Sequence, residues 1–346
     1  MIKHIEIQGL NGNRGDSLVY DFNSDLNIFT GQNGCGKTTL LKILWYICSG
    51  NINCLLQEVV FHYIKLETDK HKFEIGQVNG KFKIQIDDNV FTPTQEAISL
   101  RIQIREFCKN FAAISGKTLF FPTFRRIEGG FSMGMQEMGI SQSTVNDSLR
   151  KLSDSLSSEN HKFIASVSTN DIENLLKFEY ADISKYLNDL QKNQFSKIRH
   201  LIKNGKTSKE NKLNQIEQEI AKTDELFQEK LQPFSVLDKH VKTIYKDKGI
   251  NVSPLVLGNE TKPIVSDKLS AGEKQMLSFL CYNTFYRDCI IFIDEPELSL
   301  HIDWQRKLIP VLVNQRSGNQ FFIATHSPFI YSVYPDKEII LDRDQK

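Results

Sequence analysis

The stretch from Gly31 to Thr39 carries the residues with the clearest chemical meaning in this chain. It reads Gly-Gln-Asn-Gly-Cys-Gly-Lys-Thr-Thr and meets the pattern of Gly, four residues, Gly, Lys and Ser or Thr. Glycines let successive backbone N–H groups turn toward a phosphate, and a helix N-terminus adds its positive end. We therefore predict a nucleoside-triphosphate site whose binding residues are Asn33, Gly34, Cys35, Gly36, Lys37, Thr38 and Thr39.

Within this loop, two side chains have defined expected tasks. Lys37 is expected to bridge the β- and γ-phosphates, and the Thr38 hydroxyl is placed to ligate the Mg²⁺ that spans them. The flanks agree, because residues 26–29 read as a short buried strand and residues 39–47 as a core helix. A glycine-rich turn that matches by chance is the alternative, and this context disfavours it.

A second candidate group lies at residues 289–296, a continuous apolar run that ends in two acids. Such a run is typical of a central parallel strand, which would deliver Asp294 and Glu295 to its carboxyl end. Asp294 is expected to hold the Mg²⁺ that Thr38 also faces, and Glu295 to accept a proton from the water that attacks the γ-phosphate. A solvated turn is the alternative for an isolated acid pair, but the phosphate loop favours the catalytic interpretation.

Two further motifs complete the set. Residues 269–275 read Leu-Ser-Ala-Gly-Glu-Lys-Gln, in which the Ser270 hydroxyl and the Gly272 N–H, at a helix start, can form an anion site. Alone, this segment would be only a capped helix start, with Ser270 as N-cap and Glu273 in the first turn. His326 follows the apolar run 321–325; alone, it would be a structural histidine.

Taken together, these motifs resemble those of ATP-binding-cassette (ABC) proteins. Residues 269–275 resemble the signature motif, and His326 resembles the switch histidine that senses the γ-phosphate and helps to hold the attacking water. The resemblance implies that two domains stack head to tail, with Ser270 and Gly272 of one subunit reaching the γ-phosphate held by the other. Glu295 and His326 are then the expected catalytic residues, and ATP and Mg²⁺ the expected cofactors.

Residues 293–301 point to one branch of that superfamily. The sequence Ile-Asp-Glu-Pro-Glu-Leu-Ser-Leu-His resembles the soluble branch of RecF, SMC and OLD proteins, including the "AAA family ATPases" of bacterial anti-phage defence such as Septu, retron and PARIS subunits. His301 stands where transporters carry an aspartate, and Ile302 where the defence ATPases often have proline. The segment 121–126 is also similar to those ATPases, and it places Arg125 or Arg126 near the nucleotide or the dimer face, with a structural ion pair as the alternative. Residues 11–14, after the first strand, are expected against the adenine or ribose.

The remaining pattern predicts an α/β fold: an ABC-ATPase (P-loop) head with a strand-rich N-terminal lobe and an inserted helical hairpin arm. Apolar residues alternate from 2 to 86, a strand follows at 118–122, residues 129–160 suggest a mobile loop or insertion, and a last strand lies at 337–341. The alternating apolar positions are Ile2/Ile5/Ile7, Leu18/Tyr20/Phe22, Val59/Phe61/Tyr63, Phe73/Ile75 and Phe82/Ile84/Ile86. We expect the N-terminal half of the head at 1–127, the inserted loop and arm at 128–245, and the C-terminal half of the head at 246–346.

Helical periodicity between 171 and 232, interrupted at Gly205, predicts an arm of two helices. Each would have about 25–30 residues and a length of roughly 40 Å. Lysines 197, 203, 206, 209 and 212 gather near its tip. They form either a solvated face or a site for phosphates of a partner or of DNA.

Composition bounds the remaining choices. The chain has 346 residues, 40% of them hydrophobic, which suffices for a globular core in one large or two ordinary domains. The 43 Lys and Arg nearly balance the 42 Asp and Glu, so DNA binding would need a local basic patch. The six cysteines form no C-x-x-C pair, and neither a cleavable signal nor a long apolar span is evident, so we expect a cytoplasmic protein without a membrane contact.

Three functional hypotheses remain open. The first is an ATP-hydrolysing head-to-tail homodimer, or higher oligomer, that controls an effector protein encoded nearby, a nuclease or toxin, in anti-phage defence. The second is a RecF- or SMC-like DNA-repair or chromosome-maintenance ATPase that binds duplex DNA through the arm or the dimer groove. The third keeps ATP as a structural ligand only. The resemblance includes neither the hook cysteines of long-armed repair ATPases nor the Toprim nuclease domain of OLD proteins, so we expect no nuclease activity in this chain.

Overall fold

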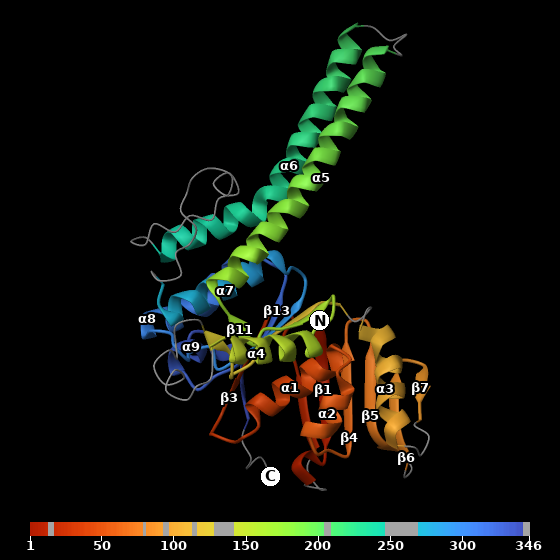
Figure 1. Ribbon diagram of the computed structural model, residues 1–346, viewed down its shortest axis with the longest axis vertical. Coiled ribbons are helices and arrows are strands. Elements are labelled where there is room, and N and C mark those ends of the chain that lie inside the picture. The colour runs from red at the N-terminus through yellow and green to blue at the C-terminus, as the bar shows by residue number, and fades with distance from the viewer. Residues whose placement is uncertain are drawn as a thin grey trace. The chain divides into compact units, whose positions relative to one another are not determined.

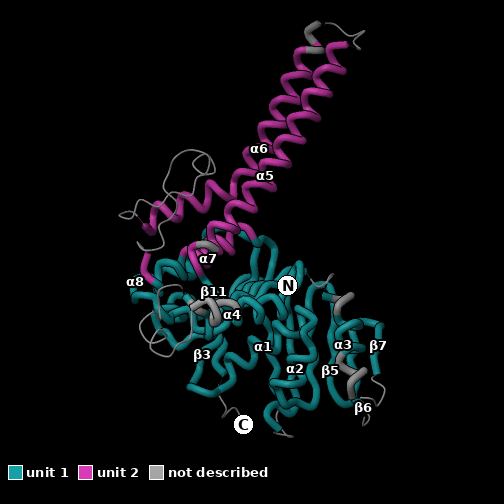
Figure 2. The backbone as a smooth tube through the Cα atoms, viewed as in Figure 1, with its two compact units in different colours: residues 1–167, 271–276, 286–346 teal, residues 168–270, 277–285 magenta. Residues whose placement is uncertain are grey.

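In the computed structural model, the described residues are 1–12, 17–78, 81–92, 97–112, 116–127, 142–203, 209–245 and 269–341. The chain forms two compact units, coloured separately in Figure 2. Unit 1 consists of Met1–Val167, Ala271–Met276 and Tyr286–Lys346, and unit 2 of Ser168–Ser270 and Leu277–Phe285. The domain boundaries expected near residues 127 and 245 stay a prediction.

Unit 1 contains a six-stranded parallel sheet in the order β10-β8-β12-β13-β3-β14. Every residue of β3, β8, β12 and β13 is buried, because strands of a parallel sheet are covered on both faces. The strands are β3 (Leu26–Thr30), β8 (Thr118–Phe121), β10 (His161–Phe163), β12 (Ile290–Asp294), β13 (Gln320–Ala324) and β14 (Glu338–Ile340). The continuous apolar runs of the sequence therefore mark the central strands.

An antiparallel sheet, in the order β2-β1-β4-β5-β6-β7, forms the strand-rich N-terminal part of unit 1. Its buried residues alternate with more exposed ones, as in β1, where Ile5 and Ile7 are fully buried. Its strands are β1 (Ile2–Gln8), β2 (Ser17–Asp21), β4 (Tyr63–Thr68), β5 (Lys72–Val78), β6 (Lys81–Ile86) and β7 (Asn89–Phe91). One face of this sheet thus supplies a layer of the core.

Helix α1 (Lys37–Cys48) joins the two sheets into one core. Nine of its twelve residues are buried, so the helix has almost no exposed face. Its apolar side chains belong to one hydrophobic cluster together with residues of both sheets, among them Ile5 of β1 and Phe120 of β8. The phosphate loop that precedes α1 is therefore fixed to the best-packed part of unit 1.

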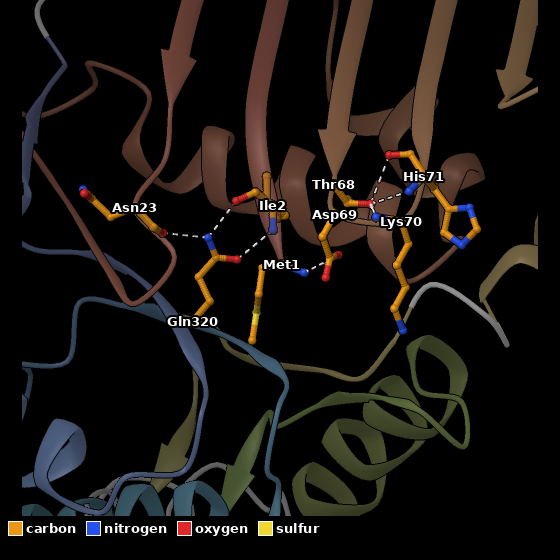
Figure 3. Close-up of polar contacts among 8 residues, drawn as sticks. All are labelled: Met1, Ile2, Asn23, Thr68, Asp69, Lys70, His71 and Gln320. Carbon is orange, nitrogen blue, oxygen red and sulfur yellow. Dashed lines mark hydrogen bonds and ion pairs between the residues drawn. The ribbon is translucent and has the colours of Figure 1, made fainter.

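A buried glutamine fastens the two sheets at the amino end of β13 (Figure 3). Gln320 Oε1 accepts a hydrogen bond from the Ile2 N–H at 2.7 Å, and its Nε2 donates to the carbonyls of Ile2 at 2.7 Å and Asn23 at 2.8 Å. Beside it, the Met1 amino group forms an ion pair with Asp69 at 2.6 Å. The start of β1 is thereby tied to the parallel sheet.

The other elements of unit 1 surround these layers (Figure 1). They are α2 (Ile52–Glu58), α3 (Ala97–Ala112), α4 (Gln142–Leu156), α8 (Ile302–Asn314), α9 (Pro328–Tyr331) and the short parallel pair β9 (Arg126–Ile127) and β11 (Ser166–Val167). Two 3₁₀ turns lie at Leu10–Gly12 and Pro335–Lys337. Helix α7 (Ala271–Phe285) contributes its first six residues to unit 1.

Unit 2 is built around a helical hairpin of α5 (Thr169–Lys203) and α6 (Lys209–Ile244), which run side by side in Figure 1. Most of the hairpin is exposed, but Phe234, Leu237 and Val241 of α6 are fully buried. The Phe234 ring packs edge-on against Phe285 of α7 at 4.8 Å. Figure 1 also shows α6 changing direction along its length, and Pro233 lies inside the helix, where proline removes a backbone hydrogen bond.

Three predictions about the elements were wrong in detail. The hairpin helices have 35 and 36 residues, so each is roughly 50 Å long rather than 40 Å. Residues 142–156, assigned to a loop, form α4; Val145, Leu149, Leu152 and Leu156 recur at helical spacing, a pattern that the Ser-rich composition of the segment outweighed in the prediction. Val59 and Phe61 are not in a strand; the chain ends α2 at Glu58 and begins β4 at Tyr63.

Some predictions fall on residues outside the described ranges: residues 13–14, the loop before 142, the interruption at Gly205, and Lys206. The side chains of Arg126, Lys209 and Lys212 also lie outside the description. The predicted fold class is confirmed. The described residues form an α/β unit with a strand-rich N-terminal part and a parallel sheet that carries the phosphate loop, and the helical hairpin is inserted in the chain.

Candidate functional site

The phosphate loop connects the end of β3 to the start of α1. Gly36, which immediately precedes α1, has φ +108°, a left-handed conformation that glycine adopts without strain. Asn33 and Gly34 are exposed, Cys35, Thr38 and Thr39 are half-buried, and Lys37 is buried. Lys37 Nζ donates to the carbonyls of Gly31 at 3.1 Å and Gln32 at 3.3 Å, so the amine lies over its own loop beside the N-terminus of α1. This end of the helix favours an anion.

Thr38 and Asp294 are brought together from two parts of the sheet. Thr38 Oγ1 donates to Asp294 Oδ1 at 3.0 Å, although 256 residues separate them. Asp294 ends β12, and only β13 lies between β12 and β3. Burial raises the pKa of the Asp294 carboxyl, while hydrogen bonds from Thr123 and Thr38 oppose that rise. The two proposed metal ligands are therefore neighbours, and their role as metal ligands stays a prediction.

A third residue at this carboxylate, Thr123, was missed by the sequence reasoning. Its hydroxyl donates to Asp294 Oδ2, so each oxygen of the carboxylate accepts from one threonine. Thr123 follows β8, the strand that pairs directly with β12. The signal was present, because a hydroxyl residue at the end of a strand next to the acidic strand falls at the same sheet edge.

Arg125 is buried behind the two acids and binds their main chain. Its Nη1 donates to the carbonyls of Pro122 at 2.8 Å and Asp294 at 2.7 Å, and its Nη2 donates to the carbonyl of Glu295 at 3.0 Å. Burial lowers the pKa of its guanidinium to about 10, and the charge of Asp294 is the main opposing influence. That Arg125 lies near the nucleotide or the dimer face stays a prediction.

The two expected catalytic side chains face each other. Glu295 Oε1 lies 3.3 Å from His326 Nε2, at the carboxyl ends of the neighbouring strands β12 and β13. Burial, helped by the nearby carboxylates of Glu297 and Asp294, raises the pKa of Glu295 to about 8. Its backbone has φ +48°, a conformation that costs a non-glycine residue about 1–3 kcal/mol. Other contacts of the fold must therefore offset two unfavourable contributions, the burial of the Glu295 carboxyl and the positive φ of the Glu295 backbone.

Glu297 is a second residue that the sequence reasoning did not single out. Its Oε1 accepts a hydrogen bond from the His326 backbone N–H at 2.6 Å. Its Oε2 is buried and has no hydrogen-bond partner among the described residues. Glu297 therefore links the turn after β12 to the loop that carries His326, and the repeated acid in Asp-Glu-Pro-Glu is the signal that could have indicated it.

The signature-like segment is anchored to the turn after β12. Ser270 is exposed and directly precedes α7. A Cβ on Gly272 would lie 2.2 Å from the carbonyl oxygen of Ser299, so only glycine fits this close approach. Gln275 Nε2 donates to the carbonyl of Pro296 at 2.7 Å. The expected reach of Ser270 and Gly272 toward a nucleotide on a second subunit stays a prediction.

The remaining candidates have structural contacts. His301 is exposed and caps α8, its Nδ1 accepting from the Asp303 N–H at 3.3 Å, and Ile302 begins that helix. Asn11 lies in the first 3₁₀ turn with φ +56°, and its N–H donates to the carbonyl of Val60. Their roles at a subunit contact or a nucleotide base stay predictions.

The donor set fits Mg²⁺ bound together with a triphosphate. Thr38 and Asp294 offer a hydroxyl and a carboxylate, hard oxygen ligands of the kind that Mg²⁺ shares with phosphate oxygens and water. Within the described residues, no group of three or more His, Cys, Asp and Glu is arranged to hold a metal by itself. The pair Thr38 and Asp294 therefore fits an ion that is bound together with a nucleotide.

Comparison with known families agrees with this geometry. The family model described as "AAA domain, putative AbiEii toxin, Type IV TA system" matches residues 26–332, which include the phosphate loop, the acidic strand and His326. The chain belongs to this AAA-domain family.

Curated relatives of this AAA-domain chain match over short segments. The DNA repair protein RAD50 of Dictyostelium discoideum is 28% identical over 104 residues, which cover 29% of this chain and 7% of that protein. The endonuclease GajA of Bacillus cereus (strain VD045) is 41% identical over 63 residues, which cover 16% of this chain and 11% of that protein. The chain thus spans only a small part of the curated relatives that it matches.

Among solved structures, the SMC head domain from Thermotoga maritima aligns with 96% of this chain and 91% of its own, at 10% identity and a TM-score of 0.45. No helix among the described residues is both long enough and apolar enough to cross a membrane.

Proposed function

We propose that this AAA-domain chain is a Mg²⁺-dependent ATPase that acts as a nucleotide-switched dimer and controls a partner effector. The observation that carries the enzymatic part is the convergence of Thr38 and Asp294 at 3.0 Å and of Glu295 and His326 at 3.3 Å, from three segments far apart in the sequence. Membership of the AAA-domain family supports the same reading.

The proposed reaction assigns one task to each side chain. Lys37 and the loop N–H groups bind the phosphates; Thr38 and Asp294 would hold Mg²⁺, which would neutralise charge that develops on the phosphate oxygens. Glu295 accepts the proton of a water molecule as its oxygen forms a bond to the γ-phosphorus and the bond to the ADP oxygen breaks. His326, within contact of Glu295, orients this water, and the products are ADP and phosphate.

The dimer and the effector are the finer parts of the proposal. Ser270 is exposed immediately before α7, where a second subunit would be able to use it. The similarity of a 63-residue segment to the endonuclease GajA supports a link to nuclease-based systems, although GajA is a larger protein than the matched segment. We propose a nuclease or toxin encoded nearby as the effector, and anti-phage defence as the setting.

The test of the enzymatic part is Glu295→Gln, with Glu6→Gln in β1 as a matched control. Wild type and Glu6→Gln are expected to release phosphate from ATP only with Mg²⁺, whereas Glu295→Gln is expected to lose at least about 99% of turnover and to accumulate ATP-bound dimers. A phosphate-release assay measures turnover, and light scattering measures dimer formation. Normal hydrolysis by Glu295→Gln would remove Glu295 from the role of base.

A second candidate function is a DNA-repair or chromosome-maintenance ATPase that binds duplex DNA itself. The similarity of a 104-residue segment to RAD50 favours it. One observation disfavours a DNA-binding patch of lysines near the tip of the hairpin. Lys197, one of these lysines, forms an ion pair with Glu219 of the facing helix at 3.1 Å. Duplex binding that weakens steeply with salt would support this function, while co-purification with a neighbouring gene product and no DNA binding alone would support the effector.

ATP as a purely structural ligand is the third reading. Turnover is measured with the purified chain, alone and with its co-purified partner. Absence of turnover in both, with ATP binding retained, would establish that reading and reject the enzymatic proposal.

A further inference from the structure

Three successive carbonyl oxygens in the turn after β12 accept hydrogen bonds from buried side chains. The guanidinium of Arg125 donates to the carbonyls of Asp294 and Glu295, at 2.7 and 3.0 Å. The amide of Gln275 donates to the carbonyl of Pro296 at 2.7 Å. The donors come from the segment after β8 and from α7, so two separate segments together hold residues 294–296.

This turn has a backbone that needs such support. Glu295 has φ +48°, in the left-handed region, and the next residue is Pro296, which further restricts the conformation of the residue before it. The Glu295 N–H is also fixed, since it donates to the carbonyl of Ala324 in β13. In this conformation the Glu295 carboxylate lies 3.3 Å from His326 Nε2.

The amide of Gln275 is committed to this contact. The side chain is 0% exposed, and only its Nε2 can donate to the Pro296 carbonyl, so the hydrogen bond fixes the orientation of the amide. Its Oε1 is buried without a hydrogen-bond partner among the described residues. A buried amide that leaves one atom unsatisfied is costly, and the hydrogen bond to Pro296 offsets part of that cost.

We propose that Arg125 and Gln275 are positioning residues that hold the backbone of residues 294–296, and thereby keep the Glu295 carboxylate aimed at His326. Through Gln275, the start of α7 and its signature-like segment are coupled to the catalytic turn of the same subunit. We call these contacts of Arg125 and Gln275 with the carbonyls of residues 294–296 the clamp. Its expected effect on kcat rests on the proposed ATPase function, but the clamp itself is present in the chain without nucleotide.

A purely structural role is the competing explanation, and the chain offers a matched control. Gln320 is also a buried glutamine with 0% exposure, and it makes three hydrogen bonds to main chain at the opposite end of the parallel sheet. Gln275→Met and Gln320→Met therefore remove similar amides from similar surroundings. Arg125→Lys keeps the charge but not the forked pair of N–H groups that serves two carbonyls.

The kinetic experiment measures kcat, KM and ATP affinity for the wild type and the three variants. Gln275→Met and Arg125→Lys are expected to lower kcat by roughly tenfold to 100-fold, because small errors in the position of a catalytic group cost that much, while the Kd for ATP changes less than about threefold. Gln320→Met is expected to lower the melting temperature and leave kcat unchanged. Equal kcat for wild type and Gln275→Met at a temperature where both are folded would overturn the proposal.

Hydrogen–deuterium exchange of the nucleotide-free protein gives a readout that does not depend on turnover. Loss of the clamp is expected to speed exchange in a peptide covering 294–300, where the N–H groups of Glu295 and Leu298 are hydrogen-bonded. Gln320→Met should leave that peptide unchanged and speed exchange at the start of β1. Unchanged exchange at 294–300 in both Gln275→Met and Arg125→Lys would overturn the clamp.

The two measurements separate the failure of this inference from failure of the proposed function. A wild type that does not hydrolyse ATP rejects the ATPase, and exchange alone then decides whether the clamp exists. Should Gln275→Met not fold, Gln275→Asn takes its place, because it keeps an amide but shortens it beyond reach of Pro296. The same kcat loss and faster exchange are expected of it.

Discussion

The two ends of the parallel sheet use buried polar side chains in different ways. At the amino end, Asn27 and Gln320 are neutral amides that bond to main chain, Asn27 to both the N–H and the carbonyl of Asn23. At the carboxyl end, the buried or half-buried groups are ionisable: Asp294, Glu295 and Arg125. The amides at the amino end bond to main chain, whereas the carboxyl end holds ionisable groups whose burial is unfavourable by itself.

This difference indicates that the amino end of the sheet contributes mainly to stability and the carboxyl end mainly to catalysis. Neutral amides that satisfy main-chain groups stabilise the fold and offer nothing to a substrate. Carboxylates with raised pKa values and a residue at positive φ cost stability, so their presence indicates function at that end. The comparison predicts that variants at the carboxyl end impair catalysis more than stability, and that variants at the amino end do the reverse.

The largest expected effect is that of Lys37→Ala. Loss of the amine beside the N-terminus of α1 is expected to abolish detectable ATP binding and turnover, because no other cation of the loop can replace it. Lys337→Ala is the control at the amino end, where Lys337 forms an exposed ion pair with Asp25 at 2.7 Å. Nucleotide binding by isothermal titration calorimetry measures both. Tight ATP binding by Lys37→Ala would contradict the assignment of nucleotide binding to the carboxyl end of the sheet.

Asn27→Leu tests the amino end. It leaves the N–H and carbonyl of Asn23 without their buried partner, so the free energy of unfolding is expected to fall by about 1–3 kcal/mol. Turnover at 20 °C should stay within about twofold of wild type, and the exposed Asn89→Leu should change neither. Chemical denaturation measures the stability of each variant, and phosphate release measures its turnover. A large loss of kcat in Asn27→Leu with unchanged stability would contradict a purely stabilising role of the amino end.

Thr123→Val sharpens the assignment at the carboxyl end. Without the hydroxyl, one oxygen of Asp294 loses its donor, so the Mg²⁺ concentration for half-maximal turnover is expected to rise by about tenfold. Thr123→Ser, which keeps a hydroxyl, should restore the wild-type requirement. An unchanged Mg²⁺ requirement in Thr123→Val would show that Thr123 has no influence on the metal ligand.

The smallest expected effect is a gain of stability in Glu295→Gln without nucleotide or metal. The folded pKa of about 8 lies above the ordinary value of 4.5, so the folded protein holds the proton more tightly than the unfolded chain does. Stability is therefore lost as pH rises from 4.5 through about 8. We expect Glu295→Gln to melt roughly 1–3 °C higher than wild type at pH 9, with a smaller difference at pH 5. A lower melting temperature at pH 9 would contradict a cost of burial here.

Much of the fold and of the site could be predicted because chemistry and burial leave strong patterns. The run 289–294 is apolar throughout, so its place in the sheet and the position of Asp294 at its end follow from the sequence. Thr123 and Glu297 left only weak signals, a hydroxyl after an apolar strand and a repeated acid, and the contacts of Gln275 left none. Each of these residues acts through a neighbour that is distant in sequence, and no residue pattern states which strands are adjacent.

The helices were harder to read than the strands. Residues 142–156 form a helix although four of the fifteen residues are Ser, whose helix propensity is modest. The limits of α5 and α6 also extend past the predicted ones, because long exposed helices carry polar residues on most of their surface and show weak end signals. Tertiary packing, rather than the local pattern, sets these boundaries.

The strand order also has a consequence for the synthesis of the chain. β3 and β8 emerge early, yet in the sheet they are separated by β12 and β13, which are made only after residue 289. At about 5–20 residues per second, the interval between residues 127 and 290 lasts on the order of 10–30 s. Throughout that time, β3 exposes both edges without any strand to pair with. The nascent chain therefore needs protection from aggregation while the long hairpin, whose contacts are local, is already able to fold.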